Sequence, residues 1–258
     1  MNAATTAERQ EPWIGMRGRI GVVIPATNIS VEYDCQRIQL PGVTWHFGRF
    51  HTPFTDLSTD AAFIKFLEGI RSTIPIAVRD LLCAEVTHMM MGMSAETFWG
   101  GVAGNQEFLD KLMAQIGAMS LTTGANAMVD ALQCFKAKRI AVLTPYQEVG
   151  DRQVLRFFGE SGFDVRRVKG LRCGSATSIA HTPRGDFVRA VIDELEGDDV
   201  DAIVQVGTNL STVDFFPTLE LMLSKPCIPI NIATVWHALR AIGVKDVVMG
   251  RGRLLEEF

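Results

Sequence analysis

The sequence predicts an α/β fold made of two pseudo-symmetric α/β halves, each a mainly parallel sheet flanked by helices, with a shared site between them. Short apolar runs alternate with longer stretches of helical periodicity along the 258 residues. The apolar runs are nearly continuous, as expected for parallel strands that are covered on both faces. Two pairs of similar segments also occur at similar offsets, which predicts that one half repeats the other.

Five apolar runs are predicted to be strands because each is short and nearly continuous. They are RIGVVIP from Arg19, EVTHMMMG from Glu85, RIAVLTP from Arg139, DAIVQVG from Asp201 and CIPINI from Cys227.

Helical periodicity predicts the segments that cover these strands. Residues 60–82 have apolar side chains at helical spacing, and Pro75 is expected to break or kink this stretch. Residues 105–117 and 185–197 form shorter amphipathic patterns, and Gly197 is expected to cap the second helix.

Two pairs of segments predict the repeat. RIGVVIPATNISVEYD from Arg19 and RIAVLTPYQEVGDRQ from Arg139 each join Arg-Ile, a strand, a proline and a polar loop. AEVTHMMMGMSAETF and VDAIVQVGTNLSTVDFF each join an acidic residue, an apolar strand and a polar loop that begins at Gly92 or Gly207. The offsets are 120 residues between the two arginines and 115 between the two glycines. Any α/β protein repeats strand–loop–helix units, and that plainer explanation stays open.

The repeat divides the chain into three predicted parts. Residues 1–17 are expected to form a disordered polar tail. Residues 18–120 together with residues 232–258 form the predicted first half, and residues 121–231 form the second.

Composition limits the partners and the compartment. The net charge is −4 and no Lys/Arg-rich run occurs, so there is no reason to expect a nucleic-acid partner. No apolar run is long enough to predict a membrane span, and the N-terminus lacks a hydrophobic signal core. We therefore expect a cytoplasmic protein, in which the five cysteines, without CxxC spacing, are free thiols.

Familiar cofactor and metal motifs are missing from the sequence. Neither GxGxxG after the first strand nor GxxxxGK[ST] occurs, which gives a nucleotide cofactor no support. The five histidines lack HExxH-type spacing, so no metal site is predicted. His88 is expected to be a core histidine, His237 to be structural, and His181 to be a candidate for proton transfer.

Polar side chains follow four of the predicted strands. Because ligands bind beyond the carboxyl ends of parallel strands, these loops are expected to converge on one site. The residues are Asn28, Ser94, Glu96, Tyr146, Thr208 and Asn209.

Each of these residues has a chemical and a structural explanation. Glu96 could serve as a general base if burial raises its pKa, or simply favour a helix N-terminus. Ser94 could donate to a substrate oxygen or cap that helix. Tyr146 is expected to supply a ligand hydroxyl, while Thr208 and Asn209 could bind a carboxylate or form an ordinary turn.

Five segments together resemble a known family. VVIPATNISVE, MGMSAETFWGG, LTPYQEV, VGTNLSTVDFFPTLE and PINIATVWHALRAIG occur in this order between about residue 18 and about residue 243. They resemble the aspartate/glutamate racemase superfamily, specifically the branch that holds arylmalonate decarboxylase and maleate cis-trans isomerase. The second segment is similar to a decarboxylase segment written Met-Gly-Thr-Ser-x-x-Phe, and the third matches the segment with the family's substrate-binding tyrosine.

The resemblance implies two related halves, no metal, no organic cofactor and a small carboxylate substrate between the halves. Loops rich in N–H and hydroxyl donors suit such a substrate. Enzymes of this type commonly self-associate, so a homo-oligomer is expected. The residues predicted to be catalytic are Ser94, Glu96 and Tyr146, and those predicted to bind substrate are Asn28, Gly92, Met93, Ser175, Gly207, Thr208 and Asn209.

The sequence departs from the family at its reactive thiols. Racemases and isomerases of this type use two cysteines, and the decarboxylase uses one. The matching positions here are Gly92 and Gly207, so the mechanism is expected to be thiol-independent. Cys173 is the only thiol in a segment that could approach the site from the second half, and a small buried side chain is its plainer role.

The sequence leaves three functions open. The first is a cofactor-independent enzyme on a small mono- or dicarboxylate, with decarboxylase/lyase- or isomerase-like chemistry. The second is a hydrolase that uses water activated by Glu96. The third is a non-catalytic carboxylate-binding protein.

Overall fold

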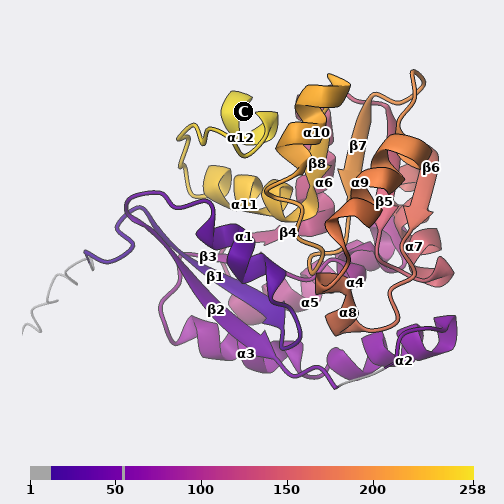
Figure 1. Ribbon diagram of the computed structural model, residues 1–258. Coiled ribbons are helices and arrows are strands. Elements are labelled where there is room, and N and C mark those ends of the chain that lie inside the picture. Colours follow the sequence, from indigo (N-terminus) through magenta and orange to yellow (C-terminus); the bar gives the residue numbers. More distant parts are fainter. Residues whose placement is uncertain (1–12, 54–55) are drawn as a thin grey trace, which may run out of the picture.

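The computed structural model describes residues 13–53 and 56–258. Its helices and strands alternate along the chain (Figure 1). The first part of the chain contains β1 (Gly18–Pro25), α1 (Ser30–Gln36), β2 (Val43–Phe50), α2 (Asp60–Ile70), α3 (Ile74–Leu82), β3 (His88–Met91), α4 (Ala95–Phe98), α5 (Gly101–Ile116) and β4 (Leu121–Thr123). The second part contains α6 (Gly124–Cys134), β5 (Arg139–Thr144), α7 (Glu148–Glu160), β6 (Asp164–Gly170), α8 (Ala176–Ala180), α9 (Arg184–Arg189), the π-helix η1 (Ala190–Leu195), β7 (Ala202–Gln205), α10 (Phe216–Leu223), β8 (Cys227–Pro229), α11 (Ile230–Ala241) and α12 (Arg253–Glu257).

The described strands form two parallel sheets with the same internal order. The first sheet is β2-β1-β3-β4 and the second is β6-β5-β7-β8. The predicted α/β fold with two similar halves is therefore confirmed, and β1 and β5 occupy equivalent central places. Since β4 belongs to the first sheet, that sheet runs three residues beyond the boundary expected at residue 120; the division into domains otherwise stays a prediction.

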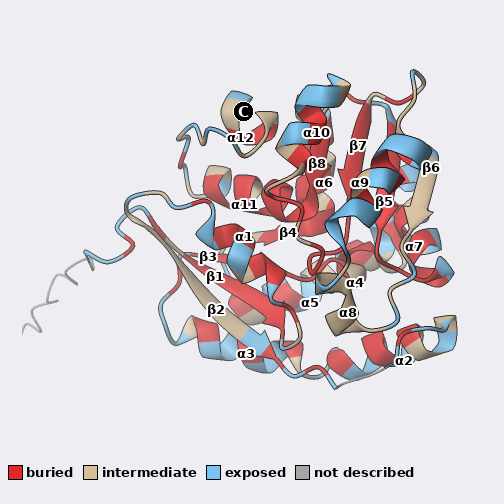
Figure 2. Ribbon diagram, viewed as in Figure 1, coloured by how far each residue is buried: buried red, intermediate tan, exposed pale blue. Residues whose placement is uncertain are grey.

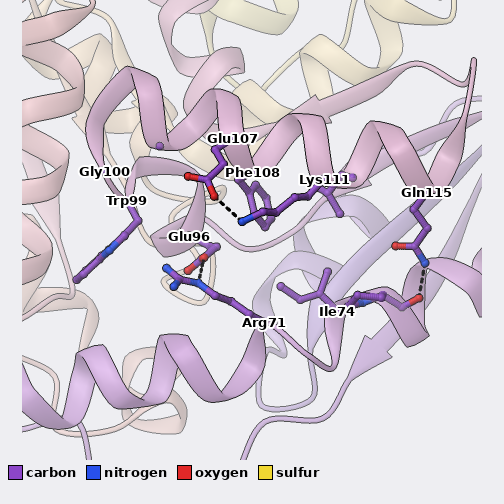
Figure 3. A pocket seen from close by; sticks show the side chains of 12 residues that line it. Arg71, Ile74, Glu96, Trp99, Gly100, Glu107, Phe108, Lys111 and Gln115 are labelled. Carbon is purple, nitrogen blue, oxygen red and sulfur yellow. Dashed lines mark hydrogen bonds and ion pairs between the residues drawn. The ribbon is translucent and has the colours of Figure 1, made fainter.

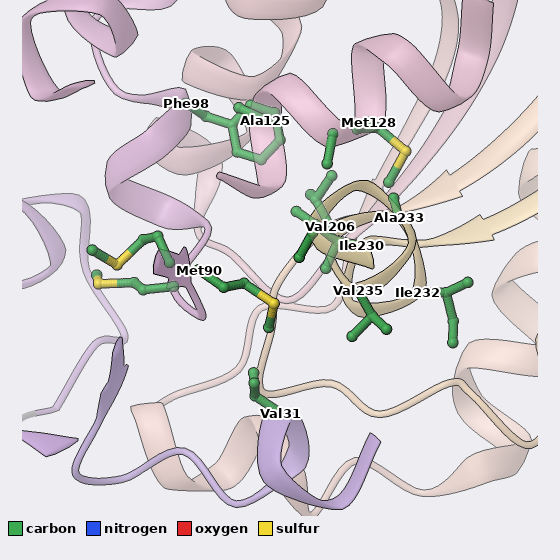
Figure 4. Packing of buried hydrophobic residues seen from close by; sticks show 14 of the residues in the cluster. Val31, Met90, Phe98, Ala125, Met128, Val206, Ile230, Ile232, Ala233 and Val235 are labelled. Atoms are coloured by element: carbon green, nitrogen blue, oxygen red, sulfur yellow. The ribbon is translucent and has the colours of Figure 1, made fainter. Parts of the chain in front are cut away.

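Helix α11 connects the two halves. It packs against α6, against β3 and β4 of the first sheet, and against β8 of the second. Figure 4 shows part of the buried cluster that results, with side chains from both halves in one group: Val31, Met90, Phe98, Met128, Val206 and Ile230.

The strands differ in burial (Figure 2), and β8 is buried throughout although it lies at the edge of its sheet. The inner strands β3 and β7 are buried throughout, whereas the edge strands β2 and β6 are mostly half-buried. The two edge strands carry polar residues, as in DVRRVKG of β6, and the apolar pattern did not predict them. An edge strand tolerates charge because one side of it faces solvent.

Helix boundaries test the remaining predictions. The break expected near Pro75 is confirmed, since α2 ends at Ile70 and Pro75 lies in the first turn of α3. The cap expected at Gly197 is wrong: η1 ends at Leu195, and its C-cap residue is Glu196, which adopts an extended conformation. Residues 1–12 of the predicted tail lie outside the described residues. Residues 13–17, also assigned to that tail, instead form a turn in which the Arg17 amide donates to the Gly42 carbonyl at 2.8 Å.

Candidate active site

The loops that follow β1, β3, β5 and β7 meet at a small cavity between the two halves. Its volume is about 60 Å³, which leaves room for roughly four water molecules. Seven residues predicted for the site line it: Asn28, Met93, Ser94, Tyr146, Gly207, Thr208 and Asn209.

Hydrogen bonds across the two halves build the polar side of the cavity. Ser94 Oγ lies 2.7 Å from Tyr146 Oη, and the Thr208 amide donates to Ser94 Oγ at 3.1 Å. The Thr208 hydroxyl donates to the Gly92 carbonyl at 3.0 Å and accepts from Asn28 Nδ2 at 3.2 Å. Residues far apart in sequence thus form one cluster of hydroxyl and amide groups.

The Ser94 hydroxyl faces the cavity and does not cap the helix that it precedes. Its side chain makes no capping hydrogen bond to α4, so the capping role is not observed. Since the Thr208 amide already donates to Ser94 Oγ, only one hydroxyl hydrogen is needed between Ser94 and Tyr146. The other hydroxyl hydrogen remains able to point at a substrate oxygen.

Tyr146 places a buried phenol group in the cavity. Burial raises the pKa of its phenol well above the ordinary value, although the hydrogen bond with Ser94 acts in the opposite direction. The phenol therefore remains a neutral hydrogen-bond donor at physiological pH. The ring also packs against Phe63, with 5.7 Å between ring centroids.

Apolar side chains form the other side of the cavity. Leu57, Phe63 and Phe66 come from α2 and the segment before it, and Ile179 comes from α8. These residues were not predicted to belong to the site. Their spacing on α2 indicates only a buried face, because apolar periodicity does not distinguish a core from a cavity wall.

Asn209 holds the loops of the two halves together. Its Oδ1 accepts from the Ile29 amide at 3.0 Å, and its Nδ2 donates to the Ala176 carbonyl at 2.8 Å. Ser175, predicted to bind substrate, instead caps α8 by accepting from the Ser178 amide.

A second polar network behind Thr208 was missed by the sequence analysis. Asn231 Nδ2 donates to the Thr208 carbonyl at 2.9 Å and to Asp34 Oδ2 at 2.6 Å. Ser211 Oγ donates to Asp34 Oδ1 at 2.6 Å. Asn231 interrupts an otherwise apolar helix start, and this polar residue was the one signal available in the sequence.

Glu96 does not reach the cavity. It lines a different pocket on the other side of α4, where its carboxylate pairs with Arg71 (Figure 3). Burial raises the pKa of Glu96, as expected, while the bond to Arg71 opposes this shift. The predicted role of Glu96 as a base in the shared site is therefore not supported by its position.

The two glycines at the thiol positions occupy different backbone conformations. A Cβ on Gly92 would lie 2.5 Å from Ile24 Cγ2. Gly207 has a φ of +102°, and a Cβ there would lie 2.4 Å from Pro145 Cδ. Neither position can take a cysteine without a local rearrangement.

The other candidates lie outside the cavity. Cys173 Sγ is 3.6 Å from Thr182 Oγ1, and no cysteine is among the described residues that line the cavity. His88 is a buried core histidine, as predicted, 2.7 Å from Ser120 Oγ, and burial lowers its pKa to about 4. His237 contacts Thr122, and His181 is exposed at the end of α8.

Membrane-spanning helices and metal-binding clusters are both absent from the described residues. No helix among them is long and apolar enough to cross a membrane. No group of three or more His, Cys, Asp or Glu side chains in residues 13–53 and 56–258 could hold a metal ion.

Comparison with known sequences identifies similar proteins. A family model described as arylmalonate decarboxylase matches residues 73–255. Maleate isomerase of Pseudomonas putida is 26% identical over 248 residues, which cover 92% of this chain and 96% of that protein. Arylmalonate decarboxylase of Bordetella bronchiseptica is 26% identical over 170 residues, which cover 65% of this chain and 70% of that protein.

Solved structures share the fold. A mutant of Nocardia farcinica maleate cis-trans isomerase with a covalently bound succinylcysteine intermediate has a TM-score of 0.82 and 22% identity, covering 93% of this chain and 99% of that one. Unliganded arylmalonate decarboxylase has a TM-score of 0.73 and 20% identity, covering 93% and 100%. The arrangement of two parallel sheets is thus common to these proteins.

Proposed function

The chain belongs to the arylmalonate decarboxylase family, and from this premise we propose that it decarboxylates a small malonate-type carboxylate without a thiol and without a cofactor. The family supports an isomerase- or decarboxylase-like enzyme. Decarboxylation is the reaction that best fits the side chains around the cavity.

One observation carries this proposal: a single small cavity has hydroxyl and amide groups on one side and apolar side chains on the other. A carboxylate placed against Phe63, Phe66 and Leu57 loses its hydration, which favours its departure as CO₂. The remaining carboxyl group, held by Ser94 and Tyr146, develops enolate charge that their hydroxyl groups stabilise.

The proposed reaction balances without a thiol. The bond between the α-carbon and the departing carboxylate breaks, and its electron pair forms the enolate of the remaining carboxyl group. A proton from water then adds to the α-carbon, and the resulting hydroxide combines with CO₂ to give bicarbonate. Tyr146 stays protonated throughout, in accord with the raised pKa of its phenol.

The alternatives fit the cavity less well. The isomerase relative of known structure carries a covalent succinylcysteine, whereas no described cavity residue is a cysteine. A hydrolase that uses Glu96 would need this carboxylate near the substrate, but Glu96 lines the other pocket.

A substrate panel with matched variants tests the proposal. Malonate, methylmalonate, phenylmalonate, maleate and maleamate are incubated with the protein in D₂O, and NMR follows the products. We expect a malonate to yield the monocarboxylic acid with deuterium at its α-carbon. Removing an oxyanion donor should lower kcat by about 10²–10³-fold in Tyr146→Phe and in Ser94→Ala.

Tyr33→Phe is the matched control, because it removes the other tyrosine hydroxyl of the chain, which bonds Asp214 outside the cavity. Its kcat should equal that of the wild type. Incorporation of ¹⁸O from water into a product acid would instead indicate hydrolysis. Thermal stabilisation by malonates without turnover of any acid would contradict the enzyme proposal and favour a binding protein.

A further inference from the structure

A second, larger pocket lies on the opposite side of α4 from the catalytic cavity. Its volume is about 480 Å³, within the range of sites for small organic molecules. Figure 3 shows that its walls come from the segment after α2, the start of α3, α4 with the residues that follow it, and most of the length of α5. The proposed decarboxylation uses none of its side chains.

Charges of both signs line this pocket in equal number. Arg71 pairs with Glu96, and Lys111 pairs with Glu107 at 2.6 Å (Figure 3). The second pair is exposed at the rim, whereas the Glu96 side chain is only 5% exposed. A ligand with a single charge could pair with only one member of the Arg71–Glu96 pair, whereas a zwitterion could pair with both.

The buried ion pair has unused hydrogen-bonding capacity. A carboxylate can accept about four hydrogen bonds, yet Glu96 receives a side-chain bond only from Arg71 Nε, and its Oε2 has no partner among the described residues. A buried carboxylate oxygen without a donor is costly. The terminal Arg71 nitrogens make no hydrogen bond within residues 13–53 and 56–258. The pair can thus take a donor at Glu96 and an acceptor at Arg71.

Apolar groups complete the lining. Ile74, Trp99, Phe108 and Leu112 line the pocket together with the charged pair. Figure 3 labels the first three of them. Trp99 also packs on Phe63, with 6.2 Å between ring centroids, and this contact holds its ring in place from the side of the catalytic cavity. An apolar body of a ligand would be buried among these four side chains.

We propose that this pocket binds an α-amino acid with an apolar side chain. Its carboxylate bonds the terminal nitrogens of Arg71, its ammonium group bonds Glu96, and its side chain packs against Trp99 and Phe108. Charge-assisted hydrogen bonds at both ends give the recognition its direction. This binding is independent of the reaction in the other cavity.

Three related ligands test the two charged contacts. Isothermal titration of the full chain is performed with L-phenylalanine, with 3-phenylpropionate, which lacks the ammonium group, and with 2-phenylethylamine, which lacks the carboxylate. We expect L-phenylalanine to bind at least about tenfold more tightly than either analogue, since one hydrogen bond to a charged group is worth about that factor. Equal affinity for all three, or no binding of L-phenylalanine, would overturn the proposal.

Variants assign the binding to this pocket. Glu96→Gln keeps the side-chain shape but removes the charge, and should weaken L-phenylalanine binding about tenfold. Binding of the anion 3-phenylpropionate should not weaken, because the substitution removes a negative charge beside Arg71. Glu68→Gln, which removes an exposed carboxylate of α2 outside the pocket, is the control and should bind as the wild type does. Unfolding temperatures identify a variant that is misfolded. Wild-type affinity in a folded Glu96→Gln protein would show that the ligand binds elsewhere.

Discussion

The two halves of the molecule place a buried aspartate on the helix that follows their central strand, but they give these aspartates different partners. Asp34 on α1 accepts hydrogen bonds from the Ser211 hydroxyl and the Asn231 amide. Asp151 on α7 accepts from the Thr144 hydroxyl and from the Arg172 guanidinium, the latter at 2.5 Å. Among the described residues, Asp34 thus accepts hydrogen bonds only from neutral donors, whereas Asp151 also accepts one from a cation.

The fold alone therefore does not set the charge around the cavity. Burial raises the pKa of both carboxyl groups, and that of Asp34 reaches about 7 although its two hydrogen bonds oppose the shift. Asp34 also feels Asp214 and Arg251, whose effects oppose each other. Because Asn231 connects Asp34 to the Thr208 carbonyl, ionisation of this group acts next to the candidate active site.

The largest expected effect is the pH dependence that Asp34 confers on stability. Its folded pKa of about 7 exceeds the ordinary value of 3.8, so the folded state binds more protons between about pH 4 and 7. The contribution is fully present below about pH 4 and is lost as the pH rises through 7, on the order of 4 kcal/mol. Denaturant unfolding of the wild type and Asp34→Asn from pH 4 to 8 should show this difference in slope. Parallel curves for the two proteins would contradict a raised pKa of Asp34 in the folded state.

The next largest effect is the difference in stability loss between alanine variants of the two loop glycines. Gly207→Ala should destabilise the protein by about 3 kcal/mol, because the left-handed backbone costs about 1–2 kcal/mol and the overlap with Pro145 about 1–3 kcal/mol. Gly92→Ala suffers only an overlap, with Ile24, and should lose about 1–2 kcal/mol less. Urea unfolding of both variants measures the difference. Equal losses would mean that the second loop relaxes its backbone freely.

The sequence could predict the buried strands and the residues of the strand-end loops, since both follow from local patterns. Apolar continuity identified β1, β3, β5, β7 and β8, and polar residues after them marked most of the polar side chains of the cavity. Glu96 was misplaced because Ser94 and Glu96 lie two positions apart on a short turn, and the sequence does not show that they face different pockets. Asp34 and Asn231 are separated by 197 residues, so no local pattern could reveal their bond.

The smallest effect is the salt dependence of the stability loss when the arginine near the start of each central strand is replaced. Arg139 Nη2 lies 2.5 Å from Asp201 Oδ1, and this bond, with two backbone amides, holds the pKa of Asp201 at about 2. Arg19 Nε instead donates to the neutral Glu85 carbonyl at 3.0 Å. Because the Arg139 pair is partly exposed, Arg139→Ala should lower the unfolding free energy only slightly at low salt and by less in 1 M NaCl, where screening is strong. The loss in Arg19→Ala should depend less on salt, because Arg19 forms no ion pair with another residue of the described ranges 13–53 and 56–258. Unfolding at both salt concentrations distinguishes the two, and an equal salt response in both variants would show that the repeated Arg-Ile start serves one structural role in the two halves.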